Sequence, residues 1–170
     1  MQALIYFFVE LCLLRKGPQE LPASSALLGL ALGADLAVGV VIGLAAGVSA
    51  GIGLTRGAVE IALMLMLLYL ALHFTRRLPR FTQTATALLG AGALIGLAAA
   101  LPVAMLPAGE AEPPSALAVL LFLGLIAWSV LVAGHILRHT FGLTLGQGAV
   151  IALAFDLLAY NLTGALFSVP

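Results

Sequence analysis

The feature that most constrains this chain is an apolar run from Ser24 to Ala50, which contains a single charged side chain, Asp35. An α-helix rises 1.5 Å per residue, so about 20 apolar residues are enough to cross the hydrocarbon core of a bilayer. The run therefore predicts a membrane-spanning helix with a carboxyl group near its middle. Hydrophobic residues make up 63% of the chain and charged residues 8%, which excludes an ordinary soluble domain.

The same run carries a regular row of four glycines, at Gly39, Gly43, Gly47 and Gly51. In one continuous helix this spacing predicts a glycine zipper, a face without side chains that a neighbouring helix can approach closely. Packing within the bundle is favoured over a dimer interface, because the other spans already supply neighbours. Asp35 lies one step earlier in the same series, so its carboxyl group is expected on or beside this packing face.

The rest of the chain repeats the long apolar pattern. The predicted spans are residues 24–50, 57–74, 82–106, 115–137 and 144–167. Residues 3–14 are apolar but too short to span, so they predict a helix that lies in the membrane interface or is only partly inserted, with Tyr6, Phe7 and Phe8 near the lipid headgroups. Ser24 and Ser25 are expected to cap the first span. The predicted fold is an all-α integral membrane bundle of five transmembrane helices plus a short N-terminal interfacial helix, in a single domain.

The distribution of positive charge predicts the orientation of the chain. Six basic residues fall in segments on one side of the predicted membrane, and only Arg56 falls on the other side. These six, here called the basic rim, are Arg15, Lys16, Arg76, Arg77, Arg80 and Arg138. Basic loops stay in the cytoplasm, so a bacterial inner-membrane protein is predicted, with a cytoplasmic N-terminus and a periplasmic C-terminus. The loop with Glu110 and Glu112 is expected on the periplasmic side.

Two acids are expected deep in the membrane. Asp35 lies 11 residues after Ser24 and Asp156 lies 12 after Thr144, which corresponds to depths of about 16 to 18 Å. An ionised Asp at the bilayer centre costs about 2.5 to 3.5 kcal/mol, so at least one is expected to be protonated. Either the two acids form a proton or cation site on a transport path, or each donates a hydrogen bond to a partner helix. The second interpretation is favoured, with Ser129 as the nearest partner by depth.

The other polar residues favour structural roles. Glu60 is expected in the first turn of its helix, where the helix dipole favours a carboxylate, and Asn161 and Thr163 lie at comparable depth. The chain has three histidines and a single cysteine, Cys12, and their spacing matches no recognised metal motif. No cofactor or metal is predicted. No nucleophile elbow, phosphate loop or dinucleotide fingerprint is present, so no enzyme activity is expected.

The arrangement resembles the Yip-domain family of membrane proteins. The similarity lies in five spans with a cytoplasmic N-terminus, and in two segments that flank the second loop, Leu70-Ala71-Leu72-His73-Phe74 and Arg80-Phe81-Thr82-Gln83-Thr84. Trp128, and the continuation through Leu137-Arg138 into the fifth span, fit as well. Eukaryotic members act in vesicle trafficking with small GTPases. The chain lacks their long cytoplasmic N-terminal region, so the resemblance implies no GTPase partner and transfers no functional residues.

These observations lead to two functional hypotheses. The first is a non-enzymatic accessory or scaffolding subunit that acts through helix–helix and lipid contacts. Its expected partners are the lipid bilayer and either another membrane protein or a second copy of the chain, and no nucleic acid. The second is a small permease coupled to protons or cations that uses Asp35 and Asp156.

Overall fold

In the computed structural model, residues 2–106 and 113–167 are described, and all their regular elements are helical. The α-helices are α1 (Gln2–Cys12), α2 (Ser25–Ala45), α3 (Ala50–Phe74), α4 (Phe81–Ala104), α5 (Ala116–Phe141) and α6 (Leu145–Phe167). Two short 3-10 helices, η1 (Pro18–Glu20) and η2 (Leu78–Arg80), lie in the connections. The predicted loop with Glu110 and Glu112 lies outside the described residues.

Five of these helices are long and apolar enough to cross a membrane, namely α2, α3, α4 with the preceding η2, α5 and α6. This confirms the predicted all-α bundle of five spans with a short N-terminal helix. Large aliphatic side chains cover the outside of the bundle, and Leu30, Leu101, Leu120 and Val150 are each 68–69% exposed. An apolar outer surface of this kind suits contact with acyl chains rather than water. The structure is therefore compatible with a multi-pass membrane protein.

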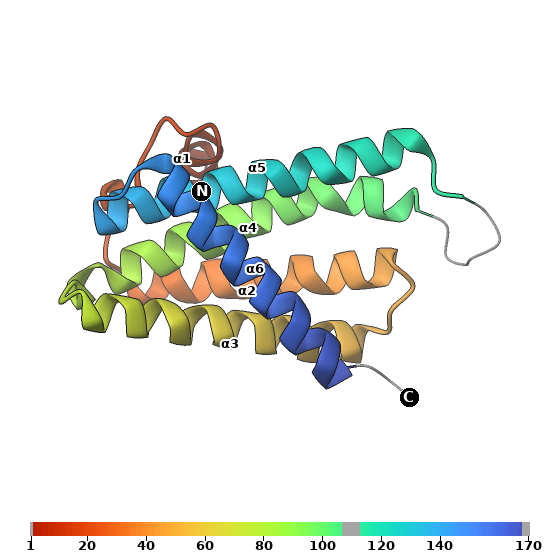
Figure 1. Cartoon of the computed structure of the whole chain (residues 1–170), viewed down its shortest axis with the longest axis horizontal. Coiled ribbons are helices and arrows are strands. Elements are labelled where there is room, and N and C mark those ends of the chain that lie inside the picture. The colour runs from red at the N-terminus through yellow and green to blue at the C-terminus, as the bar shows by residue number, and fades with distance from the viewer. Residues whose placement is uncertain (1, 107–112, 168–170) are drawn as a thin grey trace.

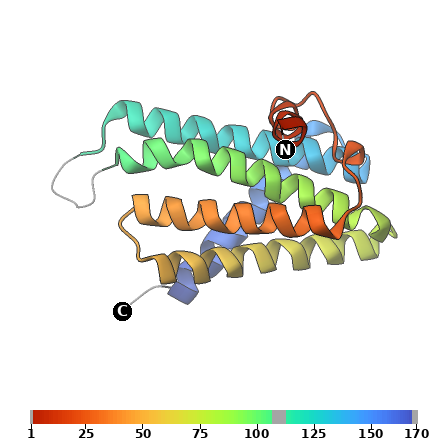
Figure 2. The ribbon, with the colours of Figure 1, turned by 180° about the vertical axis from the view of Figure 1, so that it is seen from behind.

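Four of the spans form a layer that the last span crosses. Helices α5, α4, α2 and α3 run alongside one another in that order, and α6 passes obliquely over them (Figures 1 and 2). Helix α6 contacts α5 and α3. Helix α1 runs crosswise to the layer and is seen nearly end-on in both views (Figures 1 and 2).

The first span ends earlier than the sequence predicted. Helix α2 ends at Ala45, and Gly47 follows in the left-handed conformation with φ +78°. The Val48 amide donates to the Gly43 carbonyl at 2.8 Å, which is the hydrogen bond of a Schellman motif. Helix α3 consequently begins at Ala50 rather than near residue 57. At the other end of α2, the predicted cap is confirmed, because the Ser24 hydroxyl accepts from the Leu27 amide at 3.4 Å.

The prediction of one glycine packing face is therefore wrong. Only Gly39 and Gly43 belong to α2, because Gly47 lies in the turn and Gly51 lies in α3. A Cβ at Gly43 would lie 3.5 Å from the Gly53 Cα of α3, whereas a Cβ at Gly39 or Gly51 would meet nothing within 4 Å. The row is broken because Gly47 ends the helix, so the four glycines do not lie on one common face.

Close packing between helices uses other glycines. Where α5 meets α6, a Cβ at Gly134 would lie 2.6 Å from the Ala149 amide nitrogen, and a Cβ at Gly148 would overlap the Gly134 carbonyl. Where α4 meets α2, a Cβ at Gly96 would lie 2.8 Å from the Val38 side chain. The backbones can approach this closely only because glycine has no side chain. These contacts set the distances between the spans.

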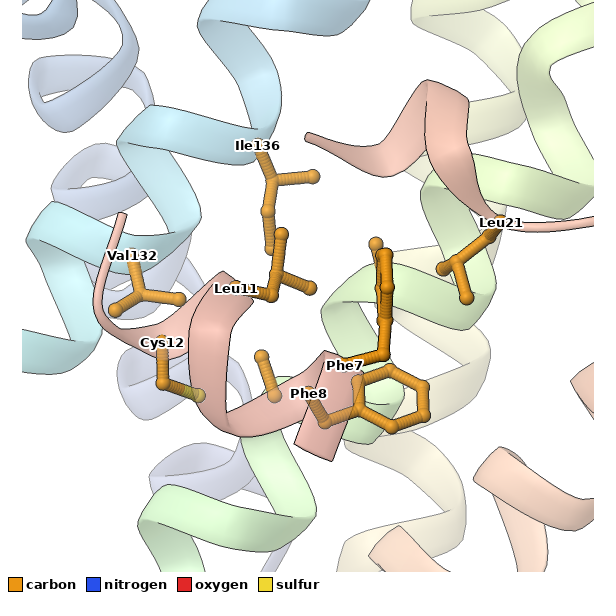
Figure 3. Close-up of a cluster of buried hydrophobic side chains, with 9 residues drawn as sticks. Phe7, Phe8, Leu11, Cys12, Leu21, Val132 and Ile136 are labelled. Atoms are coloured by element: carbon orange, nitrogen blue, oxygen red, sulfur yellow. The ribbon is translucent and has the colours of Figure 1, made fainter. Parts of the chain in front are cut away.

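Helix α1 packs against α4 and α5 through buried side chains. Phe7, Phe8, Leu11 and Cys12 of α1 join a cluster with Leu21, with Ala87 and Ala91 of α4, and with Val132 and Ile136 of α5 (Figure 3). The rings of Phe7 and Phe8 are buried against the bundle, while Tyr6 is exposed. Their position at headgroup level stays a prediction. Buried and exposed side chains alternate along α1 because the helical repeat turns only one side of this helix toward α4 and α5.

Two long-range hydrogen bonds hold the end of α1 in place. The Trp128 indole of α5 donates to the Cys12 carbonyl at 2.8 Å, and His135 Nε2 lies 2.9 Å from the Lys16 carbonyl oxygen. These bonds satisfy backbone carbonyls at and after the end of the helix. Burial also raises the pKa of the Cys12 thiol to about 11, so this cysteine is a neutral thiol near pH 7.

The α5–α6 contact predicts the effect of one added methyl group. Gly148→Ala places that methyl against the Gly134 backbone, so it is expected to lower the free energy of unfolding by about 1 to 3 kcal/mol. Gly146→Ala is the matched control, because a Cβ there meets nothing within 4 Å. Thermal unfolding of the detergent-solubilised protein, followed by circular dichroism, measures both. Equal stability of the two variants would contradict the close contact.

Candidate functional site

The bundle contains a cavity of about 670 Å³, here called the central cavity. Residues from α2, α3, α4, α5 and α6 line it, so it lies between the four-helix layer and the crossing helix α6. Most of its lining is aliphatic or aromatic. The polar side chains at its wall are Asp35 of α2, Glu60 of α3, Ser129 of α5 and Asp156 of α6. The structure thus brings together four of the six polar residues that the sequence singled out within the spans.

The three acids lie about halfway along their helices. Asp35 is ten residues from the start of α2, Glu60 ten from the start of α3 and Asp156 eleven from the start of α6. These separations correspond to about 15 to 17 Å along each helix. The expectation that Glu60 lies in a first helical turn is wrong, because α3 begins at Ala50. The helix dipole therefore does not explain the position of Glu60.

Glu60 is the acid with a cationic partner. The Arg56 Nε donates to Glu60 Oε1 at 3.2 Å, one helical turn away on α3. Arg56 was expected in the loop before this helix, but the early start of α3 places it inside the span. Asp35 and Asp156 line the same cavity as Glu60, and the three carboxyl groups are here called the acidic cluster.

The two aspartates lack protein partners. In the described ranges, neither Asp35 nor Asp156 takes part in a hydrogen bond or an ion pair. The Ser129 hydroxyl donates instead to the Ile126 carbonyl of its own helix at 2.8 Å. The favoured prediction, in which each acid donates a hydrogen bond to a neighbouring helix with Ser129 as partner, is therefore wrong. Asp35 is half-buried and Asp156 is exposed, so both can meet a small species entering the cavity.

A glycine of α4 provides the space for the Asp35 carboxyl group. A Cβ at Gly92 would lie 2.9 Å from Asp35 Oδ1, closer than carbon and oxygen normally approach. Gly92 and Gly96 are one helical turn apart, and both face α2. The sequence does not connect these glycines with Asp35, because the rotation of α2 against α4 is fixed only by packing.

Asn161 does not join the site. It is exposed and is not part of the cavity wall, and its Nδ2 donates to the Leu157 carbonyl of its own helix at 2.7 Å. Thr163 likewise donates to the Ala159 carbonyl at 2.7 Å. Both side chains satisfy their polar atoms within α6, which agrees with the structural roles expected for them.

Part of the basic rim stabilises helix ends. Arg77 donates to the Thr140 carbonyl at 2.9 Å, and Arg80 donates to the carbonyls of His139 and Thr140 at 3.0 and 2.9 Å. These carbonyls end α5, where a cation also meets the negative end of the helix dipole. Lys16 pairs with Glu10 at 3.5 Å. The remaining members are Arg15, Arg76 and Arg138. The sequence did not predict that Arg77 and Arg80 cap the end of α5, because the bonded residues are about 60 positions apart in the chain.

The histidines form no metal centre. The rings of His135 and His139 lie 4.6 Å apart, and His73 stacks on Tyr69. Within residues 2–106 and 113–167, no group of three or more His, Cys, Asp or Glu side chains is placed to hold a metal ion. Comparisons with known proteins add no relative, since no family model, curated protein or solved structure matches the chain.

A double-mutant cycle tests the contact between Gly92 and Asp35. Gly92→Ala is expected to lower the free energy of unfolding by about 1 kcal/mol, because the carboxyl group must leave its position. In an Asp35→Ala background the same change should cost less, because the colliding oxygen is absent. Gly33→Ala on α2 is the control, since a Cβ there meets nothing within 4 Å. An equal cost of Gly92→Ala in both backgrounds would refute the contact.

Proposed function

We propose that this chain is a small permease coupled to protons or cations, which uses Asp35 and Asp156 in the central cavity. The observation that supports this proposal best is that Asp35, Glu60, Asp156 and Ser129, from four different helices, line one cavity. Acids inside membrane spans typically mark ion paths and proton relays. A role in transport therefore explains why acidic side chains, whose charge is unfavourable in a bilayer, line the central cavity of an apolar bundle.

The energetics of the two aspartates support the same proposal. An ionised Asp near the centre of a bilayer costs about 2.5 to 3.5 kcal/mol, and Arg56 offsets only the charge of Glu60. Asp35 and Asp156 have no protein partner that would lower this cost. A proton or a cation bound between the helices would neutralise them. The cluster is thus suited to hold a positive species that arrives from outside the protein.

Transport also requires an element that moves, and α6 is the natural candidate. It carries Asp156, crosses the four-helix layer obliquely and contacts α5 and α3 (Figure 1). Its backbone meets α5 at Gly134 and Gly148, a contact without side chains that suits a pivot. Rocking of α6 about this contact would change access to the central cavity.

The orientation and the location of the protein belong to the same proposal. We place the basic rim on the cytoplasmic side of an inner membrane, with a cytoplasmic N-terminus and a periplasmic C-terminus. The support is the excess of Lys and Arg at one end of the bundle, where Arg77 and Arg80 meet the end of α5. The rim would also contact anionic lipid headgroups.

No observation tests the remaining functional predictions. An accessory or scaffolding subunit with a membrane-protein partner or a second copy remains a prediction, as do the absence of enzyme activity and the resemblance to the Yip-domain family. No specific contact in the described residues favours the accessory role over the permease.

Flux measurements in proteoliposomes test the proposal. Vesicles with the purified chain and a trapped pH indicator, or radioactive sodium, are given an ion gradient and a potassium diffusion potential. Proton or sodium flux is expected several-fold above that of protein-free vesicles. Asp35→Asn and Asp156→Asn should each reduce it to the protein-free level, because a neutral amide cannot exchange a proton or pair with a cation.

Glu20→Gln is the control variant, because Glu20 lies in η1 outside the cavity and its carboxylate accepts from the Gly17 amide, which an amide oxygen can also do. It should transport like the parent protein. Flux that is absent in the parent, or unchanged in both Asn variants, would overturn the permease.

A further inference from the structure

The size of the central cavity distinguishes two kinds of cargo. A bare inorganic cation needs only a shell of oxygen ligands at about 2.3 to 2.6 Å, whereas this cavity has a volume of about 670 Å³. That volume falls in the range of pockets that enclose small organic molecules, about 300 to 1,000 Å³. Such pockets combine apolar walls with a few polar groups, as this cavity does.

We propose that the central cavity binds an organic cation with an apolar body, such as a protonated amine or a quaternary ammonium or phosphonium ion. This inference rests on the proposed permease and names its substrate class. The positive centre would lie at Asp35 and Asp156, and the body would contact aliphatic walls such as Ile42, Met64 and Leu89. Charge complementarity selects this occupant over a neutral or an anionic molecule of the same size.

The charged groups around the cavity are few enough to name completely. Helix α2 contributes Asp35, α3 contributes Glu60 with its bound Arg56, and α6 contributes Asp156. Helices α4 and α5 contribute no ionisable side chain to the described lining. When the cation enters, a protonated aspartate gives its proton to water and its carboxylate pairs with the cation. An organic cation and a proton would thus compete for the same carboxylates.

Gly39 is expected to set the size of the cargo. It lines the cavity, and a Cβ at this position would meet nothing within 4 Å. A larger side chain there would therefore occupy cavity space without colliding with a neighbouring helix. Gly33 on the same helix is a matched position, since its Cβ would also meet nothing, but it does not line the cavity.

Binding of tetraphenylphosphonium to the purified full chain tests the proposal. This ion is apolar, permanently charged and free of titratable protons. Equilibrium dialysis in mild detergent should show saturable binding that strengthens as the pH rises, because protons compete for the same carboxylates. Triphenylphosphine oxide, a neutral molecule of similar shape, is the matched probe and should bind at least about tenfold more weakly.

Two kinds of variant separate charge from space. Asp35→Asn and Asp156→Asn should each weaken tetraphenylphosphonium binding by about tenfold or more. Gly39→Leu should weaken it to a similar extent, because the added side chain occupies space in the cavity. Gly33→Leu should leave binding unchanged, because Gly33 does not line the cavity. Circular dichroism and elution as a single species verify that each variant folds.

Each outcome bears on a different claim. Flux that depends on the aspartates, together with no binding of tetraphenylphosphonium, would overturn the substrate class and leave the permease. Equal binding of the neutral probe would show an apolar pocket without charge recognition and would also overturn it. Absence of both flux and binding would overturn both proposals. Burial of the exposed Asp156 side chain in a contact between two copies of the chain would also overturn both.

Discussion

The constraint on which this structure depends is the free-energy cost of two carboxyl groups that have no protein partner in the middle of an apolar bundle. Asp35 and Asp156 lie about halfway along α2 and α6, and Glu60 shares their surroundings but has Arg56 beside it. In a bilayer an unpaired charge is costly at that depth. A proton or a cation in the cavity would neutralise these groups, which links the fold to the proposed function.

The cavity exists because glycine contacts fix the helices at unequal distances. At the α5–α6 contact, Gly134 and Gly148 bring two backbones together, and Gly92 and Gly96 bring α4 close to α2. Helix α6 then crosses the four-helix layer obliquely, so it cannot contact every helix of the layer equally (Figure 2). The space left beneath its middle is lined by residues of all five spans. Close packing at a few points thus produces an open site elsewhere.

Much of the fold could be predicted from the sequence, because apolar length alone identifies the five spans and Ser24 marks the start of the first. The depth of Asp35 and Asp156 followed from the same counting. The prediction placed Gly47 inside the first span. A glycine can also adopt the left-handed conformation that ends a helix, and Gly47 does so. That error shifted the start of α3, which hid the ion pair between Arg56 and Glu60. The convergence of the acids depends on helix rotation, which long-range packing decides.

The most direct test of the central claim is the reaction of a membrane-impermeant, water-soluble thiol reagent with single cysteines placed within α5. In a Cys12→Ser background reconstituted in lipid, Ser129→Cys lies at the cavity wall and Leu123→Cys lies on the exposed apolar surface of the same helix. The account predicts reaction at position 129, slowed by a bound cation, and protection at position 123. Equal reaction at both positions, or protection of both, would contradict a hydrated acidic cavity inside a lipid-embedded bundle.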